Sequence, residues 1–186
     1  MRIFGIDPGS ACTGYGCIES DGSRHQLLVC GAITTPPHGT FPEKLLAIHE
    51  GLAVLLARWR PECVAIETLF YARNVRSALK LGHARGVAVL AAVEARLPVR
   101  EYTPTEVKQA VVGYGRAEKH QVQEMIKLLL GLRVAPVPHD VADALAVAVC
   151  HLNASNLRRK AGLPETPSIA APRRRWREYR PAIVEP

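Results

Sequence analysis

Short apolar stretches alternate with longer segments of helical periodicity along most of this chain. Three of the short stretches come first, separated only by turn residues such as Pro8-Gly9 and Asp21-Gly22, and this closeness predicts an antiparallel meander. Two more apolar stretches follow later, each behind a helical segment. The predicted strands span residues 1–7, 12–20, 26–34, 62–67 and 98–103.

Helical periodicity marks the segments around the last two strands. Apolar residues from Leu45 to Leu56 recur at the spacing of one helix face. Thr103, with Pro next and Glu106 three residues later, has the pattern of a helix start with an N-cap. Helices are therefore expected at residues 42–60, 75–96, 104–112, 118–130 and 140–153.

The order of these elements indicates the fold class. Strands that alternate with helices need crossover connections and therefore lie parallel. The sequence thus predicts an α/β protein with a mixed five-stranded sheet and helices on both faces. After Asn153 the apolar pattern fades, so residues 1–154 are expected to form the folded domain and residues 155–186 a basic, Pro-rich and flexible tail.

The 186 residues carry a net charge of +7 at pH 7, and most of the excess lies in the tail. Residues 155–186 hold eight basic and three acidic side chains, whereas the rest of the chain is close to neutral. An excess of this sign suits a polyanionic partner, either nucleic acid or an anionic membrane surface. Net positive charge also simply keeps proteins soluble, so charge alone does not separate these interpretations.

The composition excludes several classes of protein. Apolar residues make up 48% and charged residues 22%, as in soluble globular proteins. No apolar run approaches the ~20 residues of a membrane span, and Asp7 interrupts the first apolar stretch short of a signal-peptide core. The five cysteines form no C-x-x-C pair, which indicates reduced thiols in a cytoplasmic protein.

Four acidic residues occupy positions where globular proteins usually avoid charge. Asp7 ends the first strand and Glu67 the fourth, so parallel pairing would bring both to the carboxyl edge of the sheet, where ligands bind in open α/β sheets. Asp140 and Asp143, three residues apart at the start of the last helix, share one helix face. Each acid alone is explained as a helix cap or a strand-ending turn, whereas four that converge need a partner.

A divalent cation is the partner that crowded carboxylates need, because it relieves their mutual repulsion. Hard oxygen ligands without Cys or His pairs favour Mg²⁺, with Mn²⁺ as a substitute. Two ions held by these acids would activate a water and stabilise the leaving oxygen of a phosphodiester. His139, next to Asp140, is a candidate for moving a proton or touching a metal, although a lone His in a Pro-rich loop is more often a surface residue.

Aromatic and basic residues follow the fourth strand. Phe70 and Tyr71 could stack on unpaired bases while Arg73 holds phosphates, or the loop could plug into its own core. Other basic residues nearby are candidates for phosphate contacts, with ordinary helix surface as the alternative. They are Arg76, Lys80, Lys108 and Lys119.

Four blocks of the sequence, in this order and spacing, resemble the RuvC family of bacterial crossover junction endodeoxyribonucleases, the Holliday-junction resolvases. The blocks are GIDPGSACTGYG, AIETLFYARNVRSALKLGHARGVA, VKQAVVGYGRAEKHQVQ and DVADALAVAVCH, and the resemblance covers about residues 1–154. It implies a ribonuclease-H-like fold, a homodimer, and paired symmetric nicks in four-way DNA junctions that leave 5′-phosphate and 3′-hydroxyl ends. It also implies a partner in a branch-migration helicase complex of the RuvA and RuvB type.

The resemblance also implies roles for single residues. The family's base-stacking aromatic falls onto Phe70, and its functional lysines fall onto Lys108 and Lys119. Some relatives carry His in place of the third acid, whereas here Asp140 holds that place with His139 just before it. The family's four catalytic acids fall onto Asp7, Glu67, Asp140 and Asp143.

The main hypothesis is therefore a Mg²⁺-dependent endonuclease of DNA recombination and repair. The first alternative is a non-catalytic DNA-binding module, which the acids oppose because bare carboxylates repel DNA. The second is an ATPase that uses the Gly-rich turn from Gly5 to Ser10, which lacks the Lys-Ser/Thr ending of a P-loop. A related nuclease that acts on RNA is a closer rival.

Overall fold

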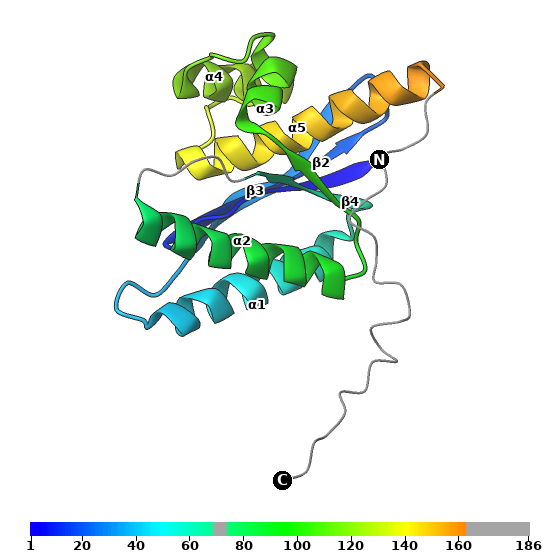
Figure 1. Ribbon diagram of the computed structural model, residues 1–186. Coiled ribbons are helices and arrows are strands. Elements are labelled where there is room, and N and C mark those ends of the chain that lie inside the picture. The colour runs from blue at the N-terminus through cyan, green and yellow to red at the C-terminus, as the bar shows by residue number, and fades with distance from the viewer. Residues whose placement is uncertain (69–73, 163–186) are drawn as a thin grey trace.

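A five-stranded sheet runs through the computed structural model, which describes residues 1–68 and 74–162 (Figure 1). The spatial order is β3-β2-β1-β4-β5; β1, β2 and β3 pair antiparallel, and β4 pairs parallel with both β1 and β5. The predicted mixed sheet is thus confirmed. Its strands are β1 (Arg2–Asp7), β2 (Cys12–Ser20), β3 (His25–Thr34), β4 (Cys63–Glu67) and β5 (Val99–Tyr102).

Helices cover both faces of this sheet (Figure 1). Helices α1 (Phe41–Trp59) and α2 (Val75–Glu94) lie together on one face. Helix α5 (His139–Lys160) crosses the other face, and α3 (Pro104–Val112) and α4 (Lys119–Leu129) pack on it. Among the helices of the described ranges, none combines the length and the apolar character needed to cross a membrane.

The start of α3 is as the sequence predicted, and the end of α5 is not. The Thr103 hydroxyl accepts a hydrogen bond from the Glu106 backbone N–H at 3.2 Å, and the Glu106 carboxylate accepts one from the Thr103 N–H at 2.7 Å. Helix α5 continues to Lys160, beyond the predicted end at Asn153. None of the residues 153–160 in its last turns is fully buried, so these turns need no apolar stripe. Their basic side chains suit the negative end of the helix dipole.

Strand alternation divides the core into two halves. Along β1, Phe4 and Ile6 face α1 and α2, whereas Ile3 faces the α5 side. Along β4, Val64 and Ile66 again pack towards α1 and α2. Successive side chains point to opposite faces, so the residues that end both strands lie on the α5 side of the sheet.

Two glycines let α5 approach this face closely. A Cβ atom at Gly5 would collide with the backbone oxygen of Ala144, and one at Gly14 with the backbone oxygen of Asp140. Both contacts are with main chain, which cannot rotate away. The absence of side chains at Gly5 and Gly14 therefore sets how near the start of α5 lies to β1 and to the start of β2.

Candidate active site

The ends of β1 and β4 lie side by side at one edge of the sheet. The register pairs Ile6 with Ile66, so Asp7 and Glu67 follow at neighbouring positions on parallel strands. Both side chains are partly buried on the α5 side. The sheet pairing thus brings together two acids that stand sixty residues apart in the chain.

Helix α5 supplies the other two acids. Asp140 and Asp143 lie in its first turns, and Gly14 contacts the Asp140 main chain. This contact places the start of the helix over the end of β1 and the start of β2. The charges of Asp143, Glu67 and Asp140 all raise the pKa of Asp7, which shows that these three acids lie close to it. Four carboxylates from three separate elements therefore share one site.

Burial and repulsion by neighbouring acids shift the pKa values of Asp7 and Glu67 upwards, towards their neutral forms. Burial is the largest cause, and the neighbouring negative charges add to it, so the pKa of Asp7 rises to about 8. The pKa of Glu67 is also raised, first by burial and then by Asp143. The contributions of the neighbouring acids show that negative charge is concentrated at this edge of the sheet.

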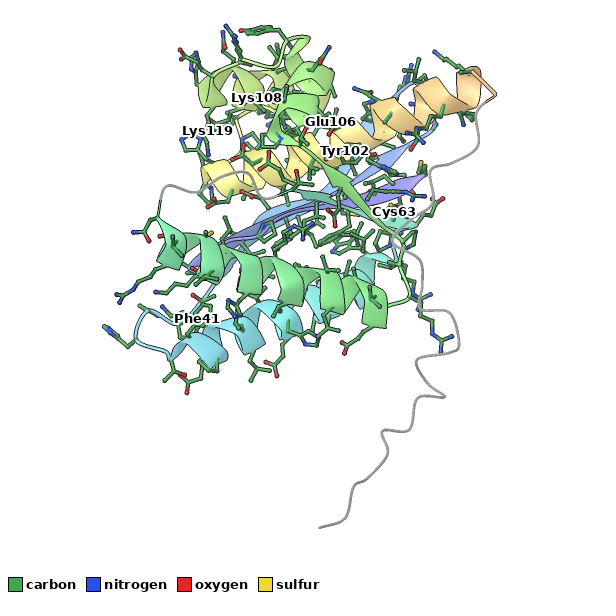
Figure 2. The ribbon with its side chains drawn as sticks, viewed as in Figure 1. Phe41, Cys63, Tyr102, Glu106, Lys108 and Lys119 are labelled. Carbon is green, nitrogen blue, oxygen red and sulfur yellow. The ribbon has the colours of Figure 1, made fainter. Side chains whose placement is uncertain are left out.

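Two lysines border the acids (Figure 2). Lys119 Nζ lies 3.2 Å from Asp143 Oδ2, and this ion pair raises the pKa of Lys119. Lys108 on α3 acts on Glu67 and partly offsets the rise of its pKa. Figure 2 shows both lysines over the N-terminal end of α5. With Glu67 and Asp143 they line a pocket of about 180 Å³ that is wide enough for a phosphate group.

The donor set of this site fits a hard divalent cation. The four acids offer only carboxylate oxygens, the ligands that Mg²⁺ and Mn²⁺ prefer, and a cation would relieve the repulsion seen at Asp7. Within residues 1–68 and 74–162, no three Asp, Glu, His or Cys side chains lie close enough to hold one ion as they stand. The carboxylates would close on an ion by rotation about their side-chain torsions.

The other predicted residues divide into two groups. Phe70, Tyr71 and Arg73 lie outside the described residues. Helix α2 begins at Val75 with Asn74 as its N-cap. Arg76 and Lys80, two of the predicted candidates for phosphate contacts, lie on this helix, and both are exposed. His139 is the first residue of α5 and is exposed beside Asp140.

One residue near the acids escaped the sequence reasoning. The Cys12 thiol donates a hydrogen bond to the Asp140 carboxylate, and burial together with this contact raises the pKa of Cys12 to about 11. The short turn after Asp7 could have indicated that Cys12 lies near the acids. Strand β2 begins at Cys12 and pairs antiparallel with β1, with Asp7 opposite Gly14. Cys12 therefore belongs to the wall of the site.

The Gly-rich turn has a packing role. Thr13 donates a hydrogen bond from its hydroxyl to the Gly9 carbonyl at 2.9 Å, which closes the turn on itself. The backbone of α5 occupies the space next to Gly5 and Gly14. These contacts explain the glycines without a nucleotide phosphate, so nothing here favours the ATPase alternative.

Comparisons with known proteins give matches that cover most of this chain. The family model "Crossover junction endodeoxyribonuclease RuvC" matches residues 3–151. The enzyme of that name from Trichlorobacter lovleyi is 53% identical over 184 residues, which cover 97% of this chain and 100% of the relative. The solved structure of T. thermophilus RuvC in complex with Holliday junction substrate superposes with a TM-score of 0.81 at 39% identity, covering 84% of this chain and 96% of that one.

A more distant structure shares the fold. The yeast mitochondrial Holliday junction resolvase Ydc2 matches with a TM-score of 0.63 at 15% identity, over 86% of this chain and 81% of that one. The mixed five-stranded sheet between helices is thus the ribonuclease-H-like architecture of these resolvases. The fold class expected from the sequence is confirmed.

Proposed function

This chain belongs to the RuvC family of crossover junction endodeoxyribonucleases, and we propose that it resolves four-way DNA junctions by metal-dependent hydrolysis of one phosphodiester bond in each of two symmetric strands. The observation that carries the proposal is the convergence of Asp7, Glu67, Asp140 and Asp143 at one sheet edge. The products would be nicks with 5′-phosphate and 3′-hydroxyl ends.

Each part of the site has a task in this reaction. The four acids would hold two Mg²⁺ ions, or Mn²⁺ in their place, and these ions would supply activation of a water and neutralisation of charge on the phosphate. Lys119, beside Asp143, and Lys108, beside Glu67, line the same pocket and are placed to bind non-bridging phosphate oxygens. His139 is the exposed neighbour of this site and would assist proton transfer.

The DNA contacts are proposed around the same edge. Arg76 and Lys80 are exposed on the N-terminal half of α2. Phe70, Tyr71 and Arg73 follow Glu67 closely in the chain, and we assign them to base stacking and phosphate binding. Contacts of this kind respond to junction shape and backbone charge, so binding should weaken strongly with salt.

A homodimer fits the two-fold symmetry of the substrate, because paired nicks need two active sites. Helix α2 offers the surface for it. Val75, Leu79 and Leu90 are 72%, 58% and 49% exposed, and Gly82 and Gly86 line a groove beside them. We therefore place the subunit interface on this face of α2.

The cellular setting follows from family and chemistry. We infer a cytoplasmic protein that acts with a branch-migration helicase complex of the RuvA and RuvB type, and the five cysteines are free thiols, as that compartment requires. We also propose residues 1–154 as the nuclease domain and residues 155–186 as a basic tail. Because α5 continues to Lys160, the tail would begin within the last turns of this helix.

Metal-dependent nicking of a synthetic four-way junction tests the proposal. Wild-type protein should nick two symmetric strands on a denaturing gel when Mg²⁺ is present, and Asp7→Asn should not. A linear duplex, an RNA–DNA hybrid and ATP hydrolysis serve as controls for the alternative functions. Junction binding without any nicks in Mg²⁺ or Mn²⁺ would instead support a non-catalytic DNA-binding module.

A further inference from the structure

Arg85 on α2 reaches two groups next to the carboxylate cluster. Its Nη2 lies 2.7 Å from Glu101 Oε1, and its Nε donates a hydrogen bond to the backbone oxygen of Glu67 at 3.4 Å. The Arg85 side chain is 20% exposed and that of Glu101 is 30% exposed. One guanidinium group thus joins a helix to the ends of two neighbouring strands.

The packing of α2 explains how Arg85 reaches the strand ends. The buried face of the helix consists of alanines, which let the helix axis lie close to the sheet. On β5, Glu101 pairs with Ile66, and the next pair joins Tyr102 with Glu67. Beyond that pair, the Thr68 N–H donates to the Tyr102 carbonyl at 2.8 Å. The end of β4 is therefore held by β5 and by Arg85 together.

We propose that Arg85 is a positioning residue for Glu67. By fixing the main chain at Glu67, it sets the direction in which the carboxylate leaves the sheet, and the Glu101 ion pair fixes Arg85 in turn. This inference rests on the proposed function, because it gives Glu67 a cation to hold. Arg85 touches no reacting atom, so its influence on chemistry passes through Glu67.

The position of Arg85 also couples two parts of the protein. The exposed side of α2 carries Leu79 and Leu90, which we place in the subunit interface. The same helix carries Arg85 to the end of β4. Pairing of two subunits would thus steady the helix that holds Glu67 in place.

The expected effect of substituting Arg85 can be estimated from other metal sites in which a residue that orients a ligand has been removed. Loss of a residue that orients a metal ligand typically lowers metal affinity or activity by about 10–100-fold. The direct test uses Arg85→Ala, with binding of Mn²⁺ followed by electron paramagnetic resonance of the free ion. We expect a weaker Mn²⁺ affinity and a lower kcat, each by about 10-fold, with an unchanged junction Kd.

Three further variants separate positioning from general stability. Arg85→Lys keeps the charge opposite Glu101 but cannot make both contacts, so it should restore part of the affinity. Glu101→Gln frees Arg85 from its ion pair and should shift Mn²⁺ affinity in the same direction by less. Glu94→Gln is the matched control, because it removes the charge from the 2.8 Å contact between His49 and Glu94 near the far end of α2 and should leave Mn²⁺ affinity unchanged.

The outcomes are distinguishable. If Arg85→Ala binds Mn²⁺ and nicks junctions as the wild type does, the inference is wrong while the nuclease proposal stands. If Glu94→Gln weakens Mn²⁺ binding as much as Arg85→Lys does, the effect is general loosening of α2 and positioning by Arg85 is refuted. If wild-type protein fails to nick in any metal, the proposed function itself fails. Should Arg85→Ala not fold, Arg85→Lys and Glu101→Gln decide the question.

Discussion

Two titratable groups, one partly buried and one fully buried, lie in opposite environments within the same structure. Asp7, at the carboxyl edge of the sheet, has three acids around it, and its pKa rises to about 8. His151, far along α5, is 5% exposed, and its hydrogen bonds join Nδ1 to the Tyr102 hydroxyl at 2.7 Å and Nε2 to the Ser155 hydroxyl at 3.3 Å. Burial lowers the pKa of His151 to about 4, with help from nearby arginines.

Asp7 and His151 differ in their neighbours: His151 has hydrogen-bond partners, whereas Asp7 has other carboxylates. Burial disfavours the charged form at both places. His151 is neutral at pH 7, and each of its ring nitrogens has a hydrogen-bond partner within the protein. Its polar atoms therefore need no ligand, and its role is structural. Asp7 is crowded by like charges, which Lys119 offsets in part and which an added cation would relieve further. A neutral buried group whose hydrogen bonds are all satisfied indicates a structural role. A carboxylate that is repelled by neighbouring carboxylates indicates a site that binds a cation.

The largest expected effect is on chemistry at the acidic end. Asp143→Asn should lower the rate of junction nicking by at least about 1000-fold, because the metal ligands act as a unit. Junction binding should stay close to that of the wild type, since the amide keeps the shape of the side chain. Single-turnover nicking and a gel-shift titration measure the two quantities separately. Lost binding with an unchanged rate on bound junction would contradict this assignment.

Asp7→Asn should stabilise the protein while it abolishes activity. The pKa of Asp7 is raised on folding, so the folded state holds a proton that the unfolded state releases, and stability falls as pH rises from about 4 to about 8. The amide removes this loss, and in EDTA at pH 8 we expect a gain of roughly 1–3 kcal/mol. The gain should be smaller at pH 5. Thermal melts at both pH values check it, and a higher Tm for the wild type at pH 8 would contradict it.

Added metal should reverse this order. Mg²⁺ binds the folded wild type and should raise its Tm, while Asp7→Asn should respond much less. The comparison uses the same two proteins with and without Mg²⁺ at pH 8.

His151→Ala should cost stability and leave catalysis intact. The substitution leaves a cavity and removes the hydrogen-bond partner of Tyr102, at a cost of roughly 1–3 kcal/mol. The pKa of His151 is lowered on folding, so its contribution is present above about pH 6.5 and is lost as pH falls towards 4. Denaturant unfolding at pH 7 and pH 5 should therefore show a larger cost at pH 7. A changed nicking rate on bound junction would break the contrast between the two ends.

The smallest effect concerns Lys119. Its side chain is 70% exposed, so Lys119→Gln should change stability by less than about 0.5 kcal/mol. As a phosphate contact, it should reduce the slope of log binding constant against log salt by about 1. Junction titrations over a range of NaCl concentrations measure this slope. An unchanged slope would show that Lys119 contacts no phosphate and that its role is limited to the ion pair with Asp143.

Much of the site could be predicted from the sequence because simple periodicities place it. Parallel pairing of two short apolar strands, each ending in an acid, requires Asp7 and Glu67 to emerge side by side. The three-residue spacing puts Asp140 and Asp143 on one side of the last helix. What joins the two pairs is the seating of α5 against Gly5 and Gly14, which is a long-range contact with no local signal.

Other features have no local signal for a different reason. Cys12 and Arg85 act on Asp140 and Glu67 through contacts between distant parts of the chain. Neither residue stands out by composition or spacing. The extension of α5 to Lys160 was missed because a solvent-exposed helix end needs no apolar pattern.

The bare Cα of Gly14 under the Asp140 carbonyl has a consequence for protein engineering. A single methyl group there would act as a wedge that lifts the first turn of α5 without touching any lysine or arginine. A Gly14→Ala protein would bind a junction without cleaving it, which offers a way to trap recombination intermediates for isolation.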